Sequence, residues 1–86
     1  MNQSIHFPER ECWDENLRYL VFPALVNGIT IDCYLSVETL RQSFGSSLSL
    51  QDLQKHFNVH RWDFEEKAEH LIRSERIDQL GHLTID

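Results

Sequence analysis

Apolar and polar residues alternate most regularly on either side of the dipeptide Asn27-Gly28. This dipeptide favours the positive φ angles of a type I′ turn, and two apolar-rich runs at 17–26 and 29–36 flank it. The pattern predicts a β-hairpin in which one set of alternate side chains points to a single side. The side chains expected to face the core are those of Leu20, Phe22, Ala24, Val26, Ile29, Ile31, Cys33 and Leu35.

The opposite side of the predicted hairpin mixes apolar and polar residues and is a candidate contact surface. It presents Tyr19, Val21, Pro23, Leu25, Thr30, Asp32, Tyr34 and Ser36. Pro23 pairs with Asp32 in this register, where the N–H that proline lacks would point away from the second strand. We therefore expect no strand to pair at Pro23, and any further strand to join beside the second strand or along the early half of the first.

Two helices are predicted after the hairpin from their capping residues. Ser36 is placed to cap a helix over 37–44, which Gly45 would end in a left-handed conformation. Ser49 is placed to cap a second helix that ends near Asn58. Apolar residues recur at three- and four-residue spacing in both segments, so each helix is expected to bury one side.

A third helix is predicted over about 61–77, again from apolar residues at helical spacing. Short strands are expected at 82–85, after Gly81, and at 4–7, before Pro8. The order β-β-β-α-α-α-β defines an α+β class. We expect a small antiparallel sheet built on a β-hairpin with a short N-terminal and a C-terminal strand, and two to three helices packed on one face.

Composition narrows the class of protein. The chain has 86 residues, 41% of them hydrophobic, so a single domain over 1–86 is expected. It contains no run of about 18 apolar residues that could span a bilayer, and residues 1–10 do not resemble a secretory signal. We therefore expect a cytoplasmic protein without membrane contact. The 14 acidic and 8 basic residues give a net charge of −6, which opposes nonspecific binding to nucleic acid.

The nucleophiles and glycines of the chain show no catalytic constellation. Cys33 belongs to the core side of the hairpin, where a thiol is inert, and Cys12 lies among acidic residues that oppose thiolate formation. Both are expected to be reduced thiols. The three glycines, Gly28, Gly45 and Gly81, are too dispersed for a phosphate-binding loop. We therefore predict a protein that is not an enzyme and takes no cofactor.

His56 and His60 lie four residues apart, a spacing that places two imidazoles on one side of a helix and could form half of a zinc site. Asn58 lies between them and favours a helix end. No other candidate ligand has a diagnostic spacing. Metal binding is therefore the third hypothesis, and no metal ligand is assigned.

Two features are typical of nucleic-acid binding, and the charge pattern opposes both. Tyr19 and Tyr34 share the open side of the hairpin, as aromatic residues do in proteins that stack single-stranded bases. Such faces are normally surrounded by Lys and Arg, whereas here the nearby base is essentially Arg18 and Asp32 lies on the face itself. The range 50–76 could form a helix-turn-helix. The basic residues of its second helix are Arg61, Lys67, Arg73 and Arg76. Five acidic residues share that helix, so a duplex-facing surface would include matching repulsion.

Trp62 has two interpretations. If the third helix includes Trp62, its side chain points about 160° away from Phe64, off the apolar stripe, and would be an interface anchor. If Trp62 precedes the helix, it packs into the core with Phe57. We favour packing in the core, because tryptophan is usually largely buried.

Four segments of the chain match a known family. They are Ile5-His6-Phe7-Pro8, Trp13-Asp14, Val21-Phe22-Pro23-Ala24-Leu25-Val26-Asn27-Gly28 and His60-Arg61-Trp62-Asp63-Phe64-Glu65-Glu66-Lys67-Ala68-Glu69. Over nearly its whole length the chain resembles the small bacterial family catalogued as domain of unknown function 1488. The resemblance implies a compact α+β domain and brings no established activity or catalytic residues. Some relatives are labelled transcriptional regulators, so a nucleic-acid-binding regulator is the alternative function.

These observations favour an uncharacterised, non-enzymatic module for protein interaction or regulation. The partner would be another protein or a second copy of the chain, because an apolar-leaning face without a predicted cover suits such a contact. The residues proposed for the partner surface are Tyr19, Val21, Pro23, Leu25, Tyr34 and Trp62.

Overall fold

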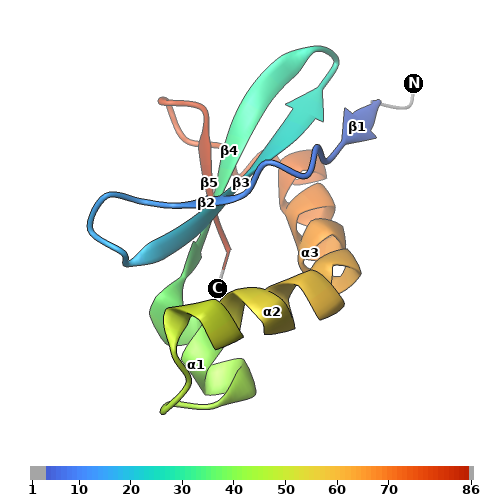
Figure 1. Cartoon of the computed structure of the whole chain (residues 1–86). Helices are drawn as coiled ribbons and strands as arrows, with labels where there is room; N and C mark the ends of the chain where they lie inside the picture. Colours follow the sequence, from blue (N-terminus) through green and yellow to red (C-terminus); the bar gives the residue numbers. More distant parts are fainter. Residues whose placement is uncertain (1–3, 86) are drawn as a thin grey trace.

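Helices lie on one face of a five-stranded sheet in the computed structural model, which describes residues 4–85 (Figure 1). The elements in chain order are β1 (Ile5–His6), β2 (Cys12–Trp13), β3 (Tyr19–Val26), β4 (Ile29–Ser36), α1 (Val37–Phe44), α2 (Leu50–Val59), α3 (Arg61–Arg73) and β5 (His82–Ile85). The strand order is β1-β3-β4-β5, and β2 also pairs with β3. The predicted α+β class is confirmed.

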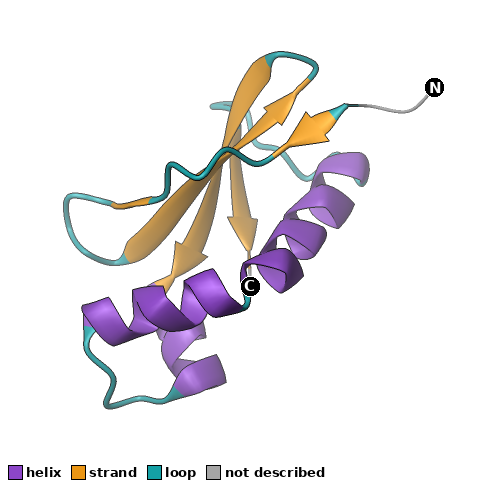
Figure 2. Cartoon of the chain, turned by 45° about the vertical axis from the view of Figure 1, so that its right-hand side comes forward, coloured by secondary structure: helices purple, strands orange, loops and turns teal. Residues whose placement is uncertain are grey.

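The β3–β4 hairpin has the predicted register. Val26 pairs with Ile29 and Leu20 with Leu35, and Asn27 and Gly28 both adopt positive φ, at 52° and 85°. The core-directed side chains are buried from Leu20 to Leu35, except that Ile29 beside the turn is 66% exposed. The hairpin extends past the helices there, as Figure 2 shows, so Ile29 has nothing to pack against.

One feature of the sheet differs from the prediction, because β5 runs parallel to β4. Asp32 pairs with His82 and Leu35 with Ile85, so the sheet is mixed rather than antiparallel. The helices α1 to α3 connect β4 to β5 and return the chain to the end of the sheet where β4 starts. Such a long crossover is what a parallel pair requires, so the expectation that every strand is antiparallel was wrong for β5.

The outer edge of β3 is paired on both sides of Pro23 but not at Pro23 itself. β1 pairs at Leu25 and Val26, and β2 pairs at Leu20 and Val21. The prediction that nothing pairs at Pro23 is confirmed. The prediction that the late half of β3 stays unpaired is wrong, because β1 covers it. β2 was missed altogether, since two residues are too few to show an alternating pattern.

The first two helices start at their predicted caps, whereas the ends of the first and third helices differ from the prediction. Ser36 Oγ accepts from Thr39 N at 3.0 Å, and Ser49 Oγ accepts from Asp52 N at 3.1 Å. Gly45 ends α1 with φ 146° and ψ 131°, outside the left-handed helical region. The third helix ends at Arg73, four residues before the predicted end, because the chain turns at Glu75 with φ 59°.

The core lies between the helices and the sheet and is centred on phenylalanine rings. The ring centroids of Phe22 and Phe57 are 5.5 Å apart, and those of Phe57 and Phe64 are 5.4 Å apart. Phe22 and Phe57 are fully buried. This packing holds α2 and α3 against β3 and leaves the other side of the sheet free of helices (Figure 2).

Candidate interaction surfaces

The face of the sheet opposite the helices is the first candidate surface, and we call it the open face. It includes Tyr19, Val21, Pro23, Leu25, Thr30, Asp32, Tyr34, Ser36, His82 and Thr84. Five of the six residues predicted for the partner surface therefore lie together. Sequence reasoning missed His82 and Thr84, which join the face because they alternate with the buried Leu83 and Ile85. The alternation was visible in the sequence, but the sequence did not show which strand β5 pairs with.

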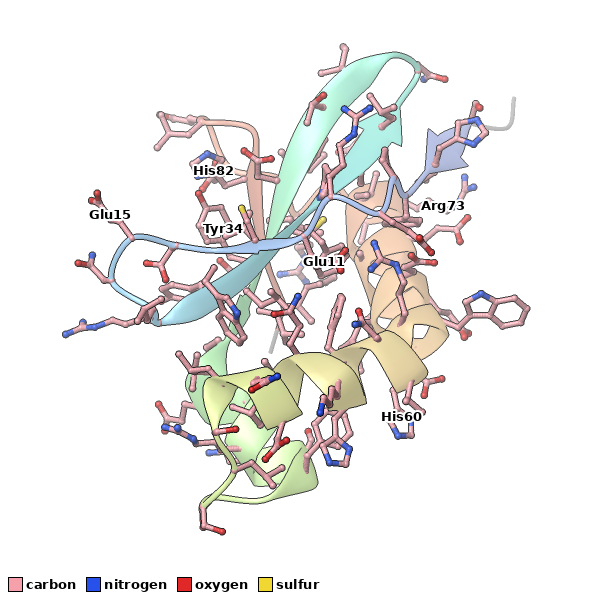
Figure 3. The ribbon with its side chains drawn as sticks, in the orientation of Figure 1. Glu11, Glu15, Tyr34, His60, Arg73 and His82 are labelled. Carbon is pink, nitrogen blue, oxygen red and sulfur yellow. The ribbon has the colours of Figure 1, made fainter. Side chains whose placement is uncertain are left out.

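A row of rings crosses the open face from β3 to β5. Tyr19 and Tyr34 meet edge to face at 5.7 Å between centroids, and Tyr34 lies 4.9 Å from His82. All three side chains are half-buried against one another. Figure 3 shows Tyr34 and His82 next to each other, away from α3. The row borders a cleft of about 240 Å³ whose other lining residues are Asp78 and Thr84.

Asp78 provides a carboxylate at this cleft and also covers part of the sheet edge. Its Oδ1 accepts from Leu80 N at 2.8 Å and from His82 N at 2.9 Å, and its backbone N donates to His82 O at 2.9 Å. The hydrogen bond from His82 N, followed by the one from Leu80 N, lowers the pKa of Asp78 despite opposing desolvation. Asp78 is therefore an anion at neutral pH and occupies both backbone groups of His82.

Trp62 does not belong to the open face, and our interpretation of it as a core residue is wrong. It lies in the first turn of α3 and is 85% exposed. The position against Phe57 is taken instead by Arg61, whose guanidinium carbon lies 5.4 Å from the centre of that ring. Because α3 starts at Arg61, Trp62 points away from the stripe formed by Phe64 and Ala68.

Arg61 is buried and holds the β1–β2 connection against α3. It donates to Glu11 Oε1 at 2.7 Å, to Glu65 Oε2 at 2.8 Å and to Pro8 O at 3.2 Å. Burial by itself raises the pKa of Glu11, but the hydrogen bond and charge of Arg61 outweigh it and lower the pKa below its usual value. Figure 3 shows Glu11 between the strands and α3. No sequence signal distinguishes Arg61 from the exposed bases of the same helix.

The bases proposed for duplex binding are thus not equivalent. Arg61 is enclosed by Glu11 and Glu65, and Arg73 Nη2 lies 2.9 Å from Glu69 Oε1. Lys67 is exposed on α3 among acidic residues. A duplex approaching α3 would meet these carboxylates, which weakens the structural basis of the nucleic-acid hypothesis.

His56 and His60 both stack on one ring rather than around a common centre. Their ring centroids lie 5.0 and 5.2 Å from that of Phe44, with interplanar angles of 14° and 25°. His60 Nδ1 also lies 3.7 Å from Asp63 Oδ2. Within residues 4–85 no group of three or more His, Cys, Asp or Glu side chains is arranged to hold a metal ion.

The two cysteines are free and lie in different settings. Cys33 is fully buried in the core, and burial, with a smaller effect from Asp32, raises its pKa to about 12. It is therefore a protonated thiol at neutral pH. Cys12 is exposed beside Val21 at the margin of the open face.

The helices of residues 4–85 also differ from membrane spans. None of them combines the length and the hydrophobicity required to cross a bilayer.

Comparison with known proteins identifies the family. Residues 5–85 match the family described as protein of unknown function (DUF1488), and the chain belongs to that family. It is 48% identical over 81 residues to the uncharacterized protein YrdB of Escherichia coli strain K12, a match that covers 94% of each chain. The uncharacterized protein YrdB of Shigella flexneri is 47% identical over the same share of both chains.

The fold is also shared with a solved member of the family. A crystal structure of a protein of unknown function from the DUF1488 family of Shewanella loihica PV-4 superimposes with a TM-score of 0.87 at 36% sequence identity. The match covers 99% of this chain and 94% of the other chain. The arrangement of helices on one face of the sheet is therefore shared by these two chains.

Proposed function

We propose that this protein is a non-enzymatic interaction module whose open face binds a segment of another protein. The observation on which the proposal rests is the row of Tyr19, Tyr34 and His82 on a sheet face without a helix on it. Rings that are already packed against one another lose little conformational entropy when a partner covers them. Aromatic side chains are enriched in protein interfaces for this reason and for their large contact area.

The charge on this face favours a partner with a cationic side chain. Asp32 lies within the face and Asp78 at its end, and none of the open-face residues is Lys or Arg. A lysine or arginine of the partner would contact the faces of the tyrosine rings and a carboxylate at the same time. The cleft between Tyr19 and His82 is suited to one such side chain.

The size of the open face favours a transient partner over a permanent dimer. β3 and β4 have eight residues each, so at about 3.3 Å per residue they are about 26 Å long, and the face measures about 500 Å². Covering it would bury about 1,000 Å² in total, the lower limit for a specific interface. Two copies with a charge of −6 each would also repel one another. Free thiols in a small domain are consistent with a cytoplasmic setting for this contact.

The proposal is tested by photocrosslinking in cells followed by measurement of affinity. A photoreactive phenylalanine analogue is placed at Thr84, on the open face, and in a control at Gln51, on the outer side of α2. The analogue at Thr84 is expected to crosslink to a partner protein, and the analogue at Gln51 is not. The captured protein is identified by mass spectrometry, purified and titrated against wild type by calorimetry. Tyr34→Ala is expected to weaken binding at least about tenfold, because it removes the central ring of the row. Tyr34→Phe, which keeps the ring, is the matched control.

Three results would contradict the proposal. Equal crosslinking from Thr84 and Gln51 would show that the open face is not selective. Binding by a folded Tyr34→Ala protein as tight as wild type would show that the row of rings is not the contact. Crosslinking of Thr84 only to a second copy, with a dimer in light scattering, would overturn the assignment of the occupant.

A further inference from the structure

A second groove lies on the helical side of the molecule, between β1 and α3, and we call it the Trp62 groove. It has a volume of about 470 Å³. Its lining residues are Ile5, Phe7, Trp62, Glu65, Glu66 and Glu69. Ile5 and Phe7 are half-buried at its base, where the centroid of Phe7 lies 6.3 Å from that of Phe22. The groove is therefore connected to the core at its floor and open at its rim.

Trp62 is the largest apolar side chain that the described residues leave in water. It is 85% exposed, although α3 buries Phe64, Ala68 and Ile72 against the sheet. Folding gains little from such a side chain, whereas a partner that covers it would remove a large apolar area from water. Tryptophan is also the residue type most enriched among those that contribute most to binding energy.

The rim of the groove is acidic and specifies the charge of what fits there. Glu65, Glu66 and Glu69 follow Trp62 at three, four and seven residues, so all share one side of α3. Glu65 and Glu69 each bond an arginine through one oxygen, whereas no ion pair within residues 4–85 involves Glu66. Among the described residues that line the groove, none is Lys or Arg. Its electrostatic complement is a cationic segment.

We infer that the Trp62 groove binds an amphipathic segment of a partner protein, with an apolar side chain against Trp62 and Phe7 and Lys or Arg side chains along Glu66 and Glu69. Nucleic acid is opposed by the same carboxylates. This surface lies on the opposite side of the sheet from the open face, so the inference does not depend on the proposed function. A protein with both surfaces could contact two partners at once.

The test uses a Leu- and Lys-rich amphipathic helical peptide as the probe and the two indole N–H signals of the ¹⁵N-labelled protein as the readout. Trp13 is the internal reference, because its Nε1 donates to Gln54 at 3.1 Å and it does not line the groove. Titration of the peptide is expected to shift the Trp62 signal and leave the Trp13 signal in place. The shift should weaken with added salt. A peptide with Glu at every Lys position should not cause it.

Substitutions distinguish binding in the Trp62 groove from nonspecific attraction of the cationic peptide to the acidic protein. Glu66→Lys is expected to weaken peptide binding at least about tenfold, whereas Glu38→Lys, the same charge change on α1, should change it less than about twofold. Trp62→Ala should remove binding and keep the wild-type melting temperature, because its side chain is exposed. Leu80→Ala, at 79% exposure, is the matched apolar control.

The inference is overturned if the Lys-rich peptide leaves the Trp62 signal unchanged up to saturating concentration. It is also overturned if the Glu-containing peptide shifts that signal equally, or if Glu66→Lys and Glu38→Lys weaken binding to the same extent. Tyr34→Ala should bind the peptide as wild type does, so that failure of the groove and failure of the open face are told apart.

Discussion

The two faces of the sheet come from the same strands, and they differ in what covers them. On the helical side, Leu20, Phe22 and Leu35 are fully buried. On the open face, their neighbours Tyr19, Val21 and Tyr34 are only half-buried, and the rings of Tyr19 and Tyr34 contact each other. Alternation along a strand thus gives one hairpin a buried side and a partly exposed side. The helical side supplies most of the stability, and the open face is the surface that we propose for contact.

The largest expected effect comes from removing a ring on the helical side. Phe57→Ala should lower the free energy of unfolding by about 3–5 kcal/mol, because it leaves a cavity between Phe22 and Phe64. Val21→Ala, on the open face, should cost about 1 kcal/mol. Urea denaturation monitored by circular dichroism measures both values. Equal losses would show that the open face contributes to the core as much as the helical side does.

The contrast between buried and exposed positions extends to the ion pairs that two arginines of α3 form. The side chain of Arg61 is 10% exposed and bonds Glu11 and Glu65, whereas that of Arg73 is 44% exposed beside Glu69. Arg61→Met should cost about 3 kcal/mol, because two carboxylates lose their partner in a poorly solvated place. Arg73→Met should cost at most about 0.5 kcal/mol, since exposed pairs contribute little. Thermal and urea unfolding of both variants compare them. Similar losses would mean that the pair at Arg61 is effectively solvated.

The smallest expected effect is a change in the pH dependence of stability. The pKa of Glu11 is lower in the folded protein than its usual value of 4.5, so the unfolded chain binds a proton more readily. The stability from this group is present above about pH 4.5 and is lost as the pH falls through the folded pKa. Glu11→Gln should therefore flatten the fall in stability between neutral and acid pH. Urea denaturation of both proteins across that range is the measurement.

Asp14 provides the control for this titration. Its pKa is also lowered, first by the backbone hydrogen bond from Tyr19. Asp14→Asn should retain the part of the loss of stability at acid pH that protonation of Glu11 causes. An unchanged pH profile in Glu11→Gln would contradict the role of Arg61 in holding the Glu11 carboxylate.

Local signals in the sequence predicted local structure well. The pair Asn27-Gly28 defined a turn and with it the pairing from Leu20 to Leu35, because a two-residue turn leaves one register. Ser36 and Ser49 predicted two helix starts, because a cap is satisfied by a backbone N–H only three residues away. Five of the six residues proposed for the partner surface were brought together for the same reason, since they belong to one hairpin.

Predictions failed for features that depend on elements distant from one another in the chain. The direction of β5 depends on the path of three helices, which no residue in 82–85 encodes. Trp62 was placed in the core and Arg61 among the bases of a possible duplex-facing helix, whereas Arg61 is buried on Phe57 and Trp62 is exposed, because the packing of α3 decides which residue of its first turn contacts that ring. His82, Thr84 and Asp78 joined the candidate site only through the pairing of β5 with β4.

The sequence by itself determined the α+β class, the hairpin register, the helix starts and an acidic chain with an uncovered sheet face. These follow from alternation, caps and turn chemistry within a few residues. Only the tertiary structure decided that Trp62 stays in water while Arg61 is buried, and that the residues proposed for contact lie on two opposite sides of the sheet. The reason is physical: burial depends on which elements pack together, and that depends on the whole chain.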